Sequence, residues 1–161
     1  MIQIQDYTKM IKNEHAMLLQ QVEGLSHADS LIQPQPGGNC LNWVLGHLAE
    51  NMQNILGMLD APHPAGIPDY KRYGYGSEPV TADAPDVVRL ETIVAHYGLL
   101  SDAICGRLEQ MSEAQFEEEI EMWQGKKTRG WAAFFLFFHN TYHLGQLEQL
   151  RNLAGRTEKV I

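Results

Sequence analysis

The stretch "FFLFFHNTYHLGQLEQL", residues 134–150, places two histidines inside one of the most apolar segments of the chain. His139 and His143 are four residues apart, so on a helix their side chains lie on one face, one turn apart. They could be two hydrogen-bonded core histidines, a catalytic pair, or two ligands of a metal ion. The spacing alone does not choose among these three interpretations.

Both histidines lie on the apolar stripe of a helix that we expect from about residue 129 to 154. Thr128 is a possible N-cap of this helix, and Gly155 is a natural residue to follow its C-terminus. Positions three or four residues apart form the stripe: Ala132, Leu136, His139, His143, Gln146, Leu150 and Leu153. Successive polar groups in a buried seam are costly unless each has a partner. We therefore expect the histidines to point into a helix bundle and to have partners there.

Helical periodicity also predicts three earlier helices, and Asn39 is a suitable N-cap for the second. Their expected ranges are 3–25, 39–60 and 85–111. Four long amphipathic helices are typical of a four-helix bundle. The sequence thus predicts an all-α protein with one domain, residues 1–161.

The connections between these helices are uneven in length. Residues 61–85 form a long loop rich in Pro and Gly, and loops of this length usually cross a bundle or cover a site. Its tyrosines, Tyr70, Tyr73 and Tyr75, either line an entrance to such a site or anchor the loop. Residues 116–130 allow a short β-hairpin, although their acidic run favours an exposed face.

Composition narrows the function and the location of the protein. The formal net charge of −8 argues against nucleic-acid binding, which depends on Lys and Arg. We find no signal peptide and no apolar segment long enough to cross a membrane. With only two cysteines, Cys40 and Cys105, a disulfide framework is not expected, and a reducing cytoplasm fits. Cys40 could be a nucleophile at a helix N-terminus, but a buried small residue is the favoured interpretation.

A third histidine, His47, lies near the middle of the second predicted helix, beside its apolar stripe. Three neutral imidazoles from two helices would suit a divalent transition metal with an open coordination position. Zinc and nickel fit best, and iron or manganese would also accept such ligands. His15, on the stripe of the first helix, is a candidate fourth ligand or neighbour of the ligands. The remaining histidines have ordinary surface roles by default: His27, His63 and His96.

Several other polar residues lie one turn from these histidines. Gln146 could orient the His143 ring, and Asn51 could donate a hydrogen bond near His47. Glu50 could accept a proton there, although a solvated carboxylate is the favoured interpretation. Tyr142 is out of register with the ligand row, which indicates packing or an interface. No catalytic residue is assigned.

The segments "NWVLGHLAENMQNIL" and "FFHNTYHLGQLEQLRNLAG" together resemble the DinB/YfiT-like superfamily. The first places Trp43 four residues before His47, and the second places a Gly-Gln pair after His139 and His143. The resemblance implies an up-up-down-down four-helix bundle with a long crossover after the second helix, commonly a homodimer. It also implies that His47, His139 and His143 bind a divalent metal.

The same superfamily includes thiol-dependent S-transferases and a thiol-dependent maleylpyruvate isomerase. The resemblance therefore implies a metal-dependent enzyme of the thiol S-transferase or hydrolase kind, with a low-molecular-weight thiol as a possible cosubstrate. The alternative is a non-catalytic dimeric module that binds a metal or a small molecule.

Overall fold

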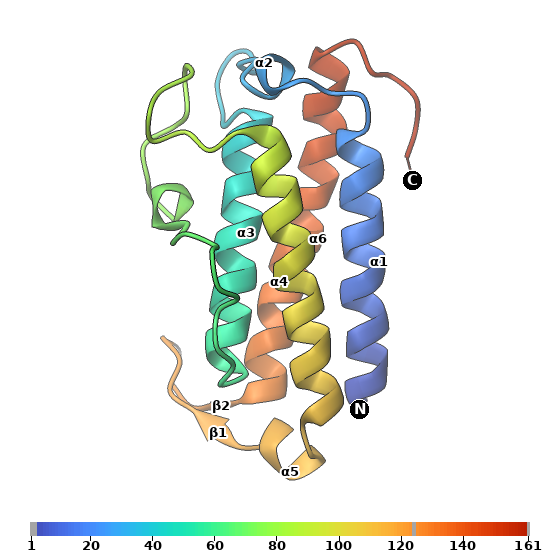
Figure 1. Ribbon diagram of the computed structural model, residues 1–161, viewed down its shortest axis with the longest axis vertical. Helices are drawn as coiled ribbons and strands as arrows, with labels where there is room; N and C mark the ends of the chain where they lie inside the picture. Colours follow the sequence, from blue (N-terminus) through green and yellow to red (C-terminus); the bar gives the residue numbers. More distant parts are fainter. Residues whose placement is uncertain (1–2, 124, 161) are drawn as a thin grey trace.

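Four long helices lie side by side and make the body of the molecule (Figure 1). The computed structural model describes residues 3–123 and 125–160. The long helices are α1 (Ile4–Val22), α3 (Leu41–Met58), α4 (Leu90–Gln110) and α6 (Arg129–Leu153). The short elements are α2 (His27–Ser30), η1 (Lys71–Tyr73), α5 (Glu113–Phe116), β1 (Glu119–Ile120) and β2 (Lys127–Thr128). The predicted all-α four-helix bundle is confirmed.

The directions of the helices differ from the expected up-up-down-down order. Tyr7, near the start of α1, donates a hydrogen bond to the carbonyl of Ala133, near the start of α6, so these two helices are parallel. Arg129, which begins α6, reaches the carbonyl of Met58, which ends α3, so α3 and α6 are antiparallel. Figure 1 shows α3 and α4 running in the same direction. The order is therefore up-down-down-up, and the expected order is wrong.

The lengths and paths of the connections explain this order. Residues 23–40 stay at one end of the bundle, where Ser26 and Asp29 form a capping box at the start of α2. The chain therefore turns back, and α3 runs opposite to α1. Residues 59–89 cross the length of the bundle and return the chain to the end where α3 began (Figure 1). The expected crossover after the second long helix is confirmed.

Helix α4 begins at Leu90, five residues later than expected, because side chains elsewhere hold the preceding backbone. Val88 donates its N–H to the Tyr73 hydroxyl, and its carbonyl accepts from Asn42. His27 Nδ1 accepts the N–H of Leu90, at the first turn of α4. His27 is therefore buried and caps a helix, which corrects the surface role expected for it.

The helix ends and the hairpin agree in part with the sequence prediction. Thr128 caps α6 by accepting the N–H of Trp131, and Gly155 has a positive φ of 77° just beyond that helix. Cys40 is the N-cap residue of α3, where Asn39 was expected. The short hairpin is confirmed as the antiparallel pair of β1 and β2. None of the helices in the described ranges is long and apolar enough to cross a membrane.

The face of α1 that points into the bundle carries Glu14, whereas the apolar stripe in the sequence predicted His15 there. Glu14 is fully buried and accepts a hydrogen bond from the Tyr97 hydroxyl of α4. Burial raises the pKa of the Glu14 carboxyl from 4.5 to about 7, because a charge is disfavoured in this apolar interior. His15 is only partly buried and packs against the edge of α4, near Gly98.

Candidate metal centre

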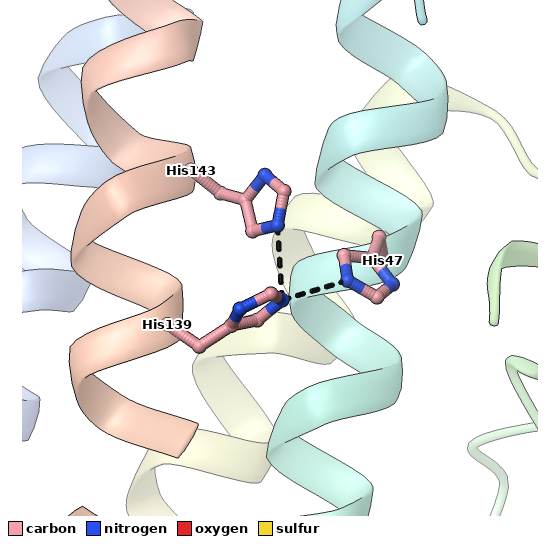
Figure 2. Close-up of side chains that lie close together, drawn as sticks. All are labelled: His47, His139 and His143. Carbon is pink, nitrogen blue, oxygen red and sulfur yellow. Dashed lines mark hydrogen bonds between the residues drawn. The ribbon is translucent and has the colours of Figure 1, made fainter. Parts of the chain in front are cut away.

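Three imidazole rings converge between α3 and α6 (Figure 2). His47 projects from α3, and His139 and His143 project from α6. The Nε2 atom of His139 lies 3.1 Å from Nε2 of His47 and 3.0 Å from Nε2 of His143. The structure thus brings together the three histidines that the sequence singled out, and each can offer one ring nitrogen within 4.8 Å of the others.

The opposite ring nitrogens of two histidines are held by oxygen atoms that can only accept a hydrogen bond. Nδ1 of His47 lies 2.9 Å from the main-chain carbonyl of Tyr73. Nδ1 of His143 lies 2.6 Å from the side-chain carbonyl of Gln146. Each Nδ1 must therefore carry the proton, and the Nε2 atom of each neutral ring presents a lone pair to the centre.

Three neutral rings carry too few protons to make a hydrogen bond at both short contacts of His139. A neutral His139 has one ring proton, which can serve at most one of its two Nε2 contacts. At least one contact then brings two lone pairs together at hydrogen-bond distance. Such a contact is unfavourable unless a further proton or a cation lies between the nitrogens.

Burial disfavours an additional proton on any of the three rings, because that proton would make the ring positively charged. Burial lowers the pKa of His47 and of His139 below the usual value, and it lowers the pKa of His143 to about 4. The hydrogen bond from His143 to Gln146 and the charge of Glu50 near His139 oppose this effect without cancelling it. The three rings are therefore neutral near pH 7, the state in which imidazole binds metal ions.

The two distances from Nε2 of His139 to the other rings suit a shared metal ion. Two nitrogens bonded at ~2.05 Å to one ion lie ~2.9 to 3.4 Å apart, for angles from a right angle to the tetrahedral angle. The separations of 3.0 and 3.1 Å fall within this range. Neutral imidazoles are also ligands that zinc, nickel, iron and manganese accept. The three histidines could therefore hold a divalent transition metal.

Residues of α3 and of the crossover together orient His47. Trp43, one turn earlier on α3, stacks on the His47 ring with their centroids 5.0 Å apart. The Trp43 indole N–H donates to Ser77 of the crossover, which fixes the indole. Gly46 lets the Tyr73 ring lie directly against the α3 backbone, because any Cβ at position 46 would overlap that ring. Tyr73 can then present its carbonyl to His47.

The buried face of α6 is rotated relative to the stripe expected from the sequence. Asn140, Leu144 and Leu147 are almost fully buried, whereas His139 and His143 are only partly buried. The reason is that α6 packs against both α1 and α3, so the centre of its buried face lies between those two neighbours. The histidines lie at the edge of this face that is toward α3, where the centre is close to the surface.

A cavity of about 550 Å³ adjoins the centre, and His47 and His139 form part of its wall. Glu50 lines this cavity and its side chain is only 18% exposed, which corrects the expectation of a solvated carboxylate. Asn51 is buried, with its amide nitrogen 3.4 Å from Nε2 of His47. Tyr75 also lines the cavity, which agrees with the expectation that a loop tyrosine could line an entrance to the site.

The side chains of the other residues considered from the sequence are not candidate metal ligands. Tyr70 and Tyr73 are buried, so they anchor the crossover on the bundle. Tyr142 is exposed and touches the His143 ring edge-on, with centroids 5.3 Å apart. His15, His63 and His96 do not join the histidine cluster, and Cys40 and Cys105 are free and buried. His63 is exposed as expected, whereas Nδ1 of His96 lies 2.8 Å from the Tyr70 hydroxyl.

Two neighbours of the centre could not be found from the sequence. The carbonyl of Tyr73 is a main-chain group, and 26 residues separate it from His47. Trp123 reaches the cavity from the turn between β1 and β2. In the sequence, the only indication that Trp123 has a special role was its aromatic side chain in an otherwise polar segment.

Comparison with known proteins places this arrangement in a family. A crystal structure of a conserved protein from Enterococcus faecalis superposes with a TM-score of 0.72 at 16% sequence identity, over 95% of this chain and 98% of that one. Among curated proteins, none matches the chain. A model of the DinB superfamily matches residues 10–147, a range that includes all three histidines. The chain belongs to the DinB superfamily.

Proposed function

We propose that the protein is a metal-dependent enzyme of the thiol S-transferase or hydrolase kind, with one divalent ion held by His47, His139 and His143. The observation that carries the proposal is the set of three converging histidines beside a cavity that His47 and His139 line. Carbonyl oxygens hold the opposite ring nitrogens of His47 and His143. Zinc or nickel is the preferred ion, and iron or manganese is also compatible with these ligands.

Each part of the site has a distinct chemical role. A divalent ion in such a site lowers the pKa of a bound water or thiol toward neutrality. The Tyr73 carbonyl and Gln146 hold the ring tautomers of His47 and His143. Glu50 faces the cavity, and Asn54 holds one of its oxygens with a 2.8 Å hydrogen bond, so its other oxygen can accept a proton from a reacting group.

The cavity favours an enzyme over a non-catalytic module, because a purely structural metal site is closed by its protein ligands. Here the three histidines would leave a coordination position for a small molecule, and the cavity lined by His47 and His139 would give access to it. A low-molecular-weight thiol is a suitable cosubstrate. We also propose a homodimer, which is supported by a row of exposed aromatic side chains on α6: Trp131, Phe138 and Tyr142.

Metal analysis of protein purified without a histidine tag tests the metal centre. We expect about one equivalent of a transition metal in the wild type and less than about a tenth in His47→Ala. His15→Ala is the matched control, because it removes a partly buried histidine outside the cluster. Wild-type protein with no metal and no thermal shift on adding Zn²⁺ or Ni²⁺ would contradict the proposal.

Activity assays on the same proteins test the enzyme proposal. Suitable reactions are thiol transfer to an aromatic electrophile and hydrolysis of an aromatic ester. We expect turnover in the metal-loaded wild type and a loss of at least about a hundredfold in His47→Ala. A variant that loses thermal stability but no turnover would instead indicate a structural metal in a non-catalytic module.

A further inference from the structure

The cavity beside the histidine centre has a chemical character of its own. It lies between α3, the crossover, the turn of the hairpin and α6, and its volume is about 550 Å³. This volume suits a small organic molecule and is too small for a folded partner. One end of the cavity is formed by His47 and His139, so a molecule inside it would contact the proposed metal position.

Aromatic and apolar side chains form most of the wall away from the histidines. Trp123 meets Phe135 edge-to-face, with ring centroids 5.4 Å apart. Trp131 stacks on Phe135 at the same centroid distance and supports it from outside the cavity. Trp123 and Tyr75 are 63% and 98% exposed, so both rings have free faces at the mouth. Such rings bind flat apolar molecules by stacking and edge contacts.

The side chains that line the cavity contribute negative charge. Glu50 contributes a carboxylate to the wall, and no Lys or Arg lines the cavity among the residues that the structure describes. Its Oε2 is 4.0 Å from Nδ1 of His47, whose proton is already donated to Tyr73, so no cationic side chain neutralises the carboxylate there. Arg129, in the neighbouring groove, is bound to Glu118 and to the Met58 carbonyl. A divalent ion at the histidine end would attract an anionic group that coordinates it. An anionic group held at the aromatic end would instead face the Glu50 carboxylate with no Lys or Arg beside it.

We propose that the cavity binds a neutral, flat aromatic molecule as the substrate of the metal centre, and that Glu50 excludes anionic analogues. This proposal rests on the proposed function, since it names the substrate class of the same site. Trp123 and Phe135 contact the aromatic body, while the polar end with His47 and His139 receives the reacting group.

Two fluorescent dyes of nearly the same shape test this proposal. N-phenyl-1-naphthylamine is neutral, and 8-anilinonaphthalene-1-sulfonate adds a sulfonate to the same ring system. We expect the neutral dye to bind the purified protein saturably, with one molecule per chain. The sulfonate should bind at least about tenfold more weakly, because its charge faces Glu50. Equal affinities, or neutral-dye binding that does not saturate, would overturn the proposal.

Four variants, two of them controls, locate the effect. Glu50→Gln should bring the affinities of the two dyes to within about threefold, whereas Asp102→Asn, an equal charge change at an exposed site on α4, should leave their ratio unchanged. Trp123→Ala should weaken the neutral dye about tenfold. Phe138→Ala removes an exposed ring of α6 outside the cavity and should have no effect. If Asp102→Asn acts like Glu50→Gln, or Phe138→Ala like Trp123→Ala, the proposal is wrong.

Metal content measured on the same samples separates the two proposals. Protein that holds metal but does not discriminate between the dyes would leave the metal centre standing and overturn the substrate class. Protein that contains no metal but binds the neutral dye through Trp123 and Glu50 would support the cavity assignment and contradict the metal-dependent enzyme.

Discussion

The side chain of Gln146 sets the ring orientation and the tautomer of His143, one of the three proposed metal ligands. Its carbonyl oxygen holds Nδ1 of His143 at 2.6 Å, which leaves the Nε2 lone pair directed at the centre. Gln146→Ala frees this ring to rotate and to change tautomer, so we expect a ~10 to 100-fold loss of metal affinity, measured by competition with a chelating dye. Gln149→Ala, one turn along and exposed, is the control. An unchanged affinity in Gln146→Ala would show that packing alone orients His143.

Glu14 is a buried carboxyl that is not part of the metal centre. Its ionisation makes the stability of the protein depend on pH. Its pKa is about 7 in the folded protein and about 4.5 when exposed, so the folded state keeps the proton longer. The free energy of unfolding therefore falls as the pH rises from about 4.5 through about 7. At ~1.36 kcal/mol per pKa unit, the total loss is roughly 3 kcal/mol.

Glu14→Gln keeps an acceptor for the Tyr97 hydroxyl and removes the titration. Urea unfolding at several pH values should find this variant more stable than the wild type above pH ~7, by up to roughly 3 kcal/mol, and similar to it below pH ~4.5. Curves for the two proteins that stay parallel across this range would mean that Glu14 is already ionised in the folded protein.

Helix α3 tolerates a methyl group at one glycine and excludes it at another. A Cβ at Gly46 would overlap the Tyr73 ring, whereas nothing lies within 4 Å of the Cβ position at Gly57. Gly46→Ala should therefore cost ~1–3 kcal/mol of stability by displacing Tyr73, and it should also weaken metal binding through His47. Gly57→Ala should be neutral or stabilising by up to ~1 kcal/mol. Thermal unfolding and metal titration of both variants check this; equal effects would contradict the close contact at Gly46.

The helices themselves were the most predictable elements, because each repeats its apolar residues every three or four positions. Exact faces were less predictable. The stripe indicated His15 and His139 as inward positions, yet Glu14 and Asn140 occupy the centres of the buried faces. A helix between two neighbours buries a wide face, and its centre depends on where the neighbours lie. Polar residues such as Glu14 and Asn140 cannot be recognised as buried until their partners are known.

The assembled molecule leaves a row of aromatic side chains uncovered along α6. Trp131, Phe138 and Tyr142 are 40%, 63% and 65% exposed and share one side of the helix. A row of this kind is typical of an interface between protein chains. We expect the protein to be a homodimer in light scattering and Phe138→Glu to be a monomer. Leu99→Glu, an equivalent change at an exposed position of α4, should remain dimeric. A monomeric wild type would contradict the dimer.

The sequence alone determined the number of long helices, the crossover and the inward pair His139 and His143, because periodicity, Pro and Gly content and spacing are local properties of the chain. His47 joined the pair as a predicted ligand through the resemblance to the DinB/YfiT-like superfamily. Only the tertiary structure decided the up-down-down-up order, since that depends on which connection crosses the bundle (Figure 1). It also decided that the Tyr73 carbonyl holds His47 and that Glu50 and Trp123 share a cavity. These contacts join segments that are distant along the chain, and their geometry follows from packing, which no local pattern encodes.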